Sequence, residues 1–202
     1  MAFPDFFEQA PALTLRDPLA EFLGAADGGL MTYRFVDAVR LTGHACPTVA
    51  VAWLMGIRGL RALWPDSTPE RGGVRVDFRR PREDGVTGVI ANVIGLLTGA
   101  VDGAGFKGIG DAHDRRLASF AQAIPLEIRM TRLDSGYAVD IGSDLSRVAP
   151  APDLPQRMHA CITGHASAED AAEFRRLWQD RVRRILCANA DDVLQILPVH
   201  SS

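Results

Sequence analysis

Apolar residues recur at helical spacing in several segments of this chain. In residues 33–41 they follow the helical repeat and stop before Gly43, which predicts a helix that ends at this glycine. A longer helix is predicted from Pro47, with apolar positions at steps of about four and Pro65 as its stop. Residues 88–98 are apolar on nearly every side, so a buried helix is predicted there.

Other segments alternate apolar and polar residues, as half-buried strands do. Residues 73–79 alternate in this way and predict a strand. Residues 124–131 and 137–141 flank the sequence Asp-Ser-Gly at positions 134–136, which predicts a hairpin. A last strand is predicted in residues 195–199.

Turn and capping signals divide the chain into a lead-in and one domain. Residues 1–28 are expected to form an N-terminal lead-in with one short helix, which Asp17 caps. Residues 149–155 are Pro-rich and predict a connector, after which Ser167 caps a long amphipathic helix. Residues 29–200 are therefore expected to form a single α+β domain, in which a mixed or antiparallel sheet packs against helices.

Composition and charge fit a globular domain and argue against several partners. The chain has 202 residues, 47% of them hydrophobic and 23% charged, with a net charge of −3. No block of Lys and Arg stands out, so nucleic acid is not expected as a partner. The longest apolar run, residues 48–54, is too short to span a bilayer, and the acidic N-terminus does not resemble a secretory signal. A soluble, cytoplasmic protein with reduced cysteines is expected.

The residues with the most distinctive chemistry are His44 and Cys46, just before the helix that begins at Pro47. In extended backbone, side chains two positions apart point to the same side, so both are expected to be partly accessible and to face a common cavity. Imidazole and thiolate are strong ligands for zinc and related metals, and a helix N-terminus stabilises a thiolate. Two ligands do not complete a tetrahedral site, so others must come from elsewhere in the fold or from a second copy. The alternative is that Cys46 is a buried packing residue.

A Gly-rich stretch, residues 99–110, precedes two further candidate residues, Asp111 and His113. The stretch does not match the P-loop, and it lacks the strand and helix that a dinucleotide-binding fingerprint requires, so we interpret it as a tight turn and a close packing approach. His113 is a candidate third metal ligand or acid–base group, and Asp111 is a second candidate for the same position. The alternative is a solvated polar loop.

A second His-x-Cys pair occurs at His159 and Cys161, with His165 close behind it. Two such pairs would supply the two nitrogen and two sulfur ligands of a tetrahedral zinc site. The second pair lies beside the expected connector, so it is a less favoured source of ligands than the first.

Residues 41–47, Leu-Thr-Gly-His-Ala-Cys-Pro, resemble the signature of the FmdE-like family of formylmethanofuran dehydrogenase components, His-Gly-His-x-Cys-Pro-Gly before an apolar helix. Residues 93–105 resemble that family's apolar helix running into Thr-Gly-Cys-Thr-x-Gly-x-Gly, and Asp111 stands where the family has an aspartate. Residues 174–199 are similar to its last helix and closing strand. The resemblance implies an FmdE-like α+β domain, a metal bound at the loop of His44 and Cys46, and a homodimer.

The chain also departs from that family. Thr42 replaces the first histidine of the signature, and Thr48 replaces its last glycine. Ala100 and Val89 occupy positions at which the family carries cysteine, and the C-terminal zinc ribbon is missing. A site without these thiolates is expected to favour Zn²⁺, Ni²⁺ or Fe²⁺ and to leave a position for water or a small ligand.

Three functions are compatible with these features. The first is a metal-binding accessory or sensor protein that holds a transition metal, with zinc as the expected ion. The second is a metal-dependent enzyme in which an open zinc position activates water. The third is a haem protein in which the cysteine of the Cys-Pro pair ligates iron. A homodimer is expected also because the apolar helix of residues 88–98 needs cover on more than one face, and the sequence does not identify a small ligand.

Overall fold

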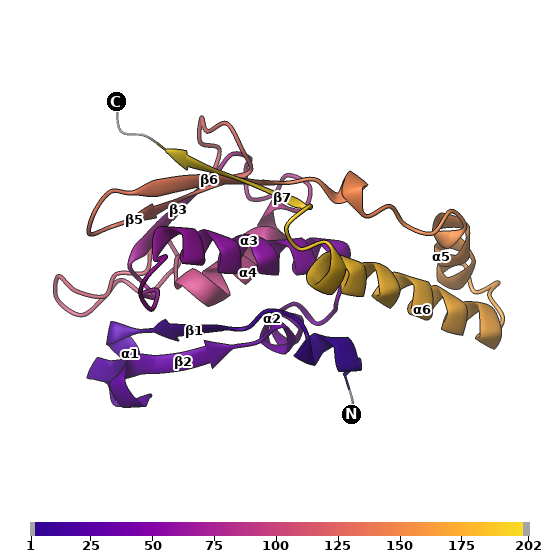
Figure 1. Ribbon diagram of the computed structural model, residues 1–202, viewed down its shortest axis with the longest axis horizontal. Helices are drawn as coiled ribbons and strands as arrows, with labels where there is room; N and C mark the ends of the chain where they lie inside the picture. Colours follow the sequence, from indigo (N-terminus) through magenta and orange to yellow (C-terminus); the bar gives the residue numbers. More distant parts are fainter. Residues whose placement is uncertain (1–2, 200–202) are drawn as a thin grey trace.

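The computed structural model describes residues 3–199 and arranges most of them in three layers. Figure 1 shows a layer of helices between a two-stranded sheet on one side and a five-stranded sheet on the other. The expected α+β class is confirmed, because sheets and helices pack around one hydrophobic core. Among residues 3–199, no helix is both long enough and apolar enough to cross a membrane.

The five-stranded sheet is mixed, with the strand order β4-β3-β5-β6-β7. Its strands are β3 (Val74–Phe78), β4 (Ala118–Ser119), β5 (Ile128–Arg132), β6 (Ala138–Ser143) and β7 (Leu194–Val199). All neighbouring strands are antiparallel except β3 and β4, which are parallel. The predicted first strand, hairpin and last strand of this sheet are confirmed. At one edge, Pro198 of β7 pairs with Val139 of β6, and the two-residue strand β4 forms the other edge.

Three helices form the middle layer, namely α2 (Phe35–Thr42), α3 (Pro47–Leu63) and α4 (Thr87–Thr98). They confirm the three helices predicted from apolar spacing. Gly43 ends α2 and Gly99 ends α4, and both adopt the left-handed conformation, with φ of 76° and 74°. Gly59 of α3 lets the sheet approach closely, because a β-carbon at this position would overlap with Met130 and Ile141.

The helix α4 packs against α2, α3 and β3 of its own chain. Its buried side chains include Ile90, Val93, Ile94 and Leu97, whereas Asn92 is exposed. One chain therefore covers most of the apolar surface of α4. The cover on more than one face that the sequence predicts for this helix is supplied by α2, α3 and the sheet of the same chain.

The N-terminal segment builds the remaining layer. Its elements are η1 (Asp5–Glu8), β1 (Leu13–Arg16), α1 (Pro18–Phe22), η2 (Asp27–Gly29) and β2 (Leu30–Tyr33). The predicted short helix is confirmed as α1, and its N-cap Asp17 accepts the N–H groups of Leu19 and Ala20. The antiparallel pair of β1 and β2 was not predicted. Phe6 and Leu15 of this segment are buried in the common hydrophobic core.

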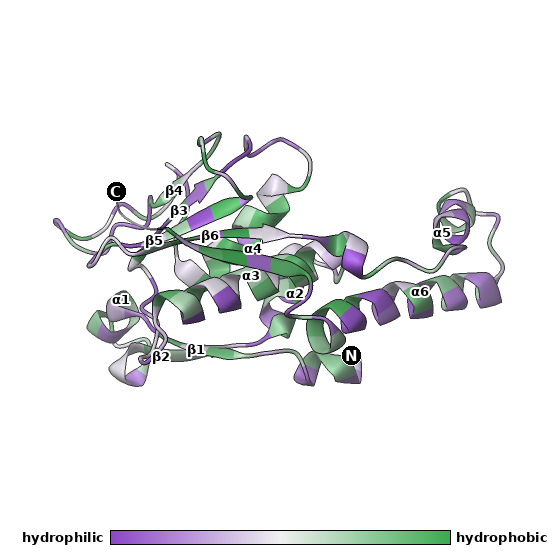
Figure 2. Cartoon of the chain, turned by 45° about the horizontal axis from the view of Figure 1, so that its top comes forward, coloured by the Kyte–Doolittle hydropathy of each residue, from purple (hydrophilic) through white to green (hydrophobic). Residues whose placement is uncertain are grey.

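Two C-terminal helices, α5 (Leu154–Ile162) and α6 (Ala168–Arg183), form an arm that extends away from the three layers (Figures 1 and 2). Ser167 caps α6 as predicted, with its hydroxyl accepting the N–H of Asp170 at 3.0 Å. The sequence predicts only a connector for residues 149–155, yet α5 begins inside it with Pro155 in its first turn. A short helix, η3 (Leu145–Arg147), precedes the arm, and a π-helical turn, η4 (Arg184–Ala188), follows it.

Candidate functional site

The loop between α2 and α3, residues 43–46, carries both primary candidate residues, and we call it the His-Cys loop. Cys46 is the N-cap of α3 and has extended backbone, with φ of −140° and ψ of 168°. Its Sγ accepts the backbone N–H of Val49 at 3.4 Å, and Pro47 occupies the first turn of the helix. The predicted position of the thiol at a helix N-terminus is therefore confirmed.

The ring of His44 is held by its own loop. Nδ1 lies 2.9 Å from the carbonyl oxygen of Thr42. A carbonyl oxygen only accepts hydrogen bonds, so Nδ1 donates to Thr42, and in the neutral imidazole Nε2 is then the nitrogen with the lone pair. His44 is exposed and Cys46 is half-buried, which confirms that both are partly accessible. The loop thus presents an imidazole in the tautomer that binds metals through Nε2.

Two residues of the arm helix α6 contact the His-Cys loop. Nε1 of Trp178 donates to the carbonyl oxygen of Ala45 at 2.9 Å, and Nε2 of Gln179 lies 3.4 Å from the same oxygen. Neither Trp178 nor Gln179 is among the candidate site residues that the sequence offers. No spacing rule could have found them, because they lie 133 and 134 residues from Ala45 in the sequence.

The structure places Asp111 and His113 together in a different pocket. This pocket has a volume of about 330 Å³ and is also lined by Glu70, Arg71 and Arg115, but not by His44 or Cys46. Within residues 3–199, no three His, Cys, Asp or Glu side chains form a group that could hold a metal ion. The four candidate residues therefore do not form one cluster, because the Gly-rich loop carries Asp111 and His113 towards α1.

The backbone around Asp111 and His113 has unusual features of its own. His113 has a φ of 63°, which is rare for a residue with a side chain, and its ring lies 5.9 Å from the ring of Phe22. The neighbouring carboxyl group of Asp114 has its pKa lowered to about 2 by hydrogen bonds from Arg116. The segment is thus a polar loop fixed by local contacts, but it is not wholly solvated, because Arg115 within it is buried.

A second pocket lies beside α4 and has a volume of about 270 Å³. Most of its lining is apolar and includes Leu41, Ala100 and Phe120, while Arg82 and Asp102 form an ion pair in its wall. His44 and Cys46 do not line this pocket, so it is not the common cavity that the sequence predicts for them. Ala100, where the resembled family carries cysteine, is buried here.

The second His-x-Cys pair lies on the arm. His159 and Cys161 belong to α5, and residues two apart on a helix do not face the same side. Nδ1 of His165 lies 2.9 Å from the hydroxyl of Thr163 in the turn that follows. The paired N₂S₂ site is not formed within residues 3–199, because it would be a group of at least three His and Cys side chains.

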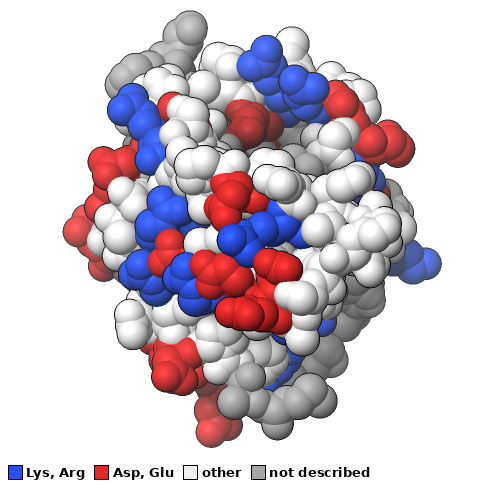
Figure 3. Space-filling view, turned by 90° about the vertical axis from the view of Figure 1, so that its right-hand side faces the viewer, with Lys and Arg blue, Asp and Glu red and all other residues white. Residues whose placement is uncertain are grey.

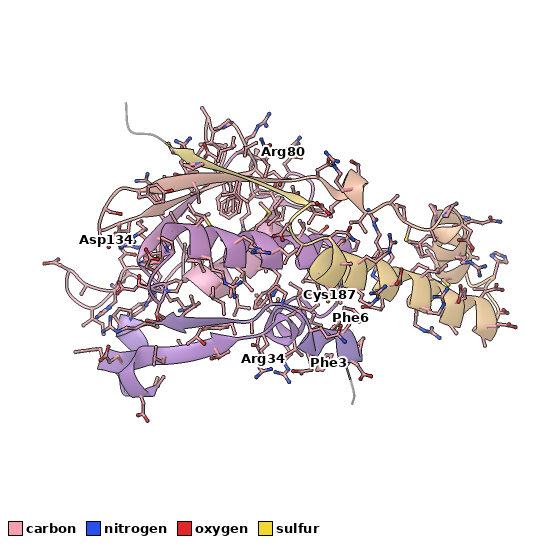
Figure 4. The ribbon with its side chains drawn as sticks, viewed as in Figure 1. Phe3, Phe6, Arg34, Arg80, Asp134 and Cys187 are labelled. Atoms are coloured by element: carbon pink, nitrogen blue, oxygen red, sulfur yellow. The ribbon has the colours of Figure 1, made fainter. Side chains whose placement is uncertain are left out.

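The third cysteine, Cys187, lies beside Phe6 in Figure 4, with its Sγ 3.9 Å from the carbonyl oxygen of that residue. Burial raises the pKa of the Cys187 thiol, so the thiol form is favoured. None of the three cysteines forms a disulfide. Cys187 is therefore a poor source of the thiolate that a metal requires.

No known family model matches the chain, and no curated protein matches it.

Proposed function

We propose that this protein binds a transition metal ion, with zinc as the expected metal, through Nε2 of His44 and Sγ of Cys46. The observation that carries the proposal is the hydrogen bond between Nδ1 of His44 and Thr42. It leaves Nε2 as the free nitrogen on a loop that also carries a thiol. Metal-binding histidines typically donate their other N–H to an oxygen in this way.

The chemistry of the two side chains suits such an ion. Imidazole nitrogen and thiolate sulfur are preferred ligands of zinc, and the N–H that Val49 donates to Sγ stabilises a thiolate at the helix N-terminus. No third His, Cys, Asp or Glu joins them within residues 3–199, so the remaining positions fall to other atoms. When bound, the ion supplies Lewis acidity, while the chain holds and orients it.

An accessory or sensor role is part of this proposal, as is a cytoplasmic location, which keeps Cys46 reduced. The acid–base candidates Asp111 and His113 line a pocket that excludes both proposed ligands. A metal-dependent enzyme needs such a group near the ion, so the geometry favours binding over catalysis. The resemblance of residues 41–47 to the FmdE-like signature supports the same loop as the metal site.

The metal content of protein purified without added metal tests the proposal. We expect close to one zinc ion per chain, or per pair of chains if two copies share the ion. Cys46→Ser should lose the metal while keeping the helix start, because serine is a good N-cap residue. Cys161→Ser is the matched control, since it removes a thiol of a His-x-Cys pair on the arm, and it should keep its metal.

The outcomes separate the alternatives. Equal loss of metal in Cys46→Ser and Cys161→Ser would contradict the proposal and point to a site built from both pairs. Retention of metal by Cys46→Ser would exclude this thiol as a ligand. A Soret absorption band would instead indicate haem bound through the cysteine thiolate.

A further inference from the structure

The pocket beside α4 is lined mostly by small and apolar residues, and we call it the α4 pocket. It has a volume of about 270 Å³ and is bordered by α2, α4, the loop that follows α4 and the edge strand β4. The space exists because four of the lining residues are alanine or glycine, namely Ala91, Gly95, Ala100 and Ala118. Leu41 and Val101 also line the pocket and are exposed. A ligand with an apolar body would remove this surface from water.

One wall of the α4 pocket is polar. Nη1 of Arg82 forms an ion pair with Asp102, and Nη2 of Arg82 donates to Oδ1 of Asn92 at 3.3 Å. The guanidinium also lies over the ring of Phe120, with Cζ 5.7 Å from the ring centroid. The side chains of Arg82 and Asp102 are 38% and 29% exposed, so both remain accessible to a ligand. This wall therefore presents N–H donors beside a carboxylate acceptor, and the pair has no net charge.

The volume and the polar wall together define the ligand. A dry cavity of about 150 Å³ holds benzene, so the α4 pocket has room for one ring with a small substituent. An anionic substituent would be repelled by Asp102, and a cationic one by Arg82. An uncharged group that carries an N–H beside an acceptor oxygen matches both side chains.

We propose that the α4 pocket binds a small uncharged molecule with an amide-like polar edge and an apolar body about the size of one ring. The oxygen of the ligand accepts from Arg82, its N–H donates to Asp102, and its body lies against Leu96 and Phe120. Neither His44 nor Cys46 lines this pocket, so the proposal does not depend on metal binding.

Titration of the full chain with benzamide, benzoate and benzamidine tests the proposal, because these probes have nearly the same size and differ in charge. The shifts of backbone amide signals in two-dimensional NMR spectra report both affinity and location. We expect benzamide to bind with a millimolar or lower dissociation constant and to shift the signals of Gly95, Ala100 and Val101. Benzoate and benzamidine should bind at least about tenfold more weakly, because each of them meets a like charge.

Two variants test the volume and the polar wall separately. Ala91→Leu fills part of the pocket and should weaken benzamide binding by at least about tenfold. Ala168→Leu is the matched control and should leave the binding unchanged, because Ala168 is exposed at the start of α6. Asp102→Asn keeps an oxygen for the N–H of Ala104 but removes the negative charge. It should reduce the preference for benzamide over benzoate by at least about tenfold, because Arg82 then attracts the carboxylate.

Several results would overturn the proposal. One is the absence of saturable benzamide binding in the millimolar range, and another is equal affinity for all three probes. Unchanged benzamide binding in a folded Ala91→Leu would place the ligand elsewhere. If Ala91→Leu does not fold, an unchanged preference in Asp102→Asn overturns the proposal instead. Loss of metal in Cys46→Ser should leave benzamide binding intact, since the two sites have no lining residue in common.

Discussion

Asp17 joins the N-terminal segment to two distant parts of the chain. Its carboxylate caps α1 and accepts hydrogen bonds from Nη1 of Arg71 at 2.8 Å and Nη2 of Arg115 at 2.6 Å. The side chains of Asp17 and Arg115 are only 4% and 6% exposed, so this is a buried ion pair rather than a surface contact. Burial raises the pKa of Asp17, but the hydrogen bond from Arg71 and the charge of Arg115 outweigh it and lower the pKa.

The substitution Asp17→Asn should therefore destabilise the protein by about 3 kcal/mol, because it leaves buried guanidinium groups without their counter-charge. Urea unfolding at neutral pH measures this change. Asp134→Asn is the matched control, since the ion pair of Asp134 with Arg132 lies at the surface and water screens it. If the unfolding free energy falls no further in Asp17→Asn than in Asp134→Asn, the structural role of Asp17 is contradicted.

The same ion pair makes stability depend on pH. A carboxyl group whose pKa is lowered by folding stabilises the protein above its unfolded pKa, here near 3.8. That contribution is lost as the pH falls through the lower, folded pKa. The difference in unfolding free energy between wild type and Asp17→Asn should hence shrink below about pH 3.8. A difference that stays constant or grows on acidification would argue against a charge effect.

At the scale of elements, close packing of α3 against the sheet depends on Gly59. A methyl group at this position would overlap with Met130 and Ile141, both fully buried. Alanine favours the helix by about 1 kcal/mol, but overpacking costs about 1–3 kcal/mol. We expect Gly59→Ala to lower the unfolding free energy, as measured with urea. Gly103→Ala is the control, because this loop position has open space around it and its unfolding free energy should change little. If Gly59→Ala is instead more stable than wild type, Met130 and Ile141 can move aside at little cost.

The sequence predicted those elements whose pattern is long or strongly capped. The helices α2, α3 and α4 were found from apolar spacing, and α6 from its Ser167 cap. The strands β1 and β2 have only four residues each and acquire their structure by pairing with one another, so local pattern does not reveal them. The helix α5 is polar and begins beside prolines, which are equally typical of a connector.

In the candidate site, too, local sequence predicts some features, whereas others depend on the packing of distant segments. The helix N-terminus at Cys46 follows from the local sequence, because Pro47 fixes where α3 begins. The contact of Trp178 with Ala45 depends on how α6 packs across the chain, and no local pattern encodes that. The expected clustering of Asp111 and His113 with the loop relied on sequence order, whereas the Gly-rich loop turns them towards α1.

At the scale of the whole molecule, the arm is the part with least cover from its own chain. Figure 3 looks onto its tip, where acidic and basic side chains alternate, and salt bridges such as Arg157 with Asp170 lie within the arm. Ile162 of α5 is nevertheless 77% exposed. Covering Ile162 would favour an association of two copies, as would covering the exposed Phe22 and Leu23 at α1.

We expect sedimentation velocity at micromolar concentration to show a homodimer, with the arm in the dimer interface. Ile162→Asp should shift the protein towards the monomer, because it would bury a charge in that contact. Leu23→Asp is the matched control, since Leu23 is 62% exposed just after α1, at the opposite end of the molecule (Figure 1). A wild-type protein that is monomeric at every concentration would refute this prediction. If both variants dissociate equally, the dimer interface does not lie specifically at the arm.

The edges of the five-stranded sheet limit how copies of this protein can meet. Pro198 has no N–H to offer, and proline in a sheet is confined to such edge positions. The opposite edge is the two-residue strand β4, too short to align another chain. Neither edge is a good template for a further strand, so fibril-like growth by strand addition is disfavoured at both. Assembly of the folded protein through either edge of the five-stranded sheet is therefore disfavoured.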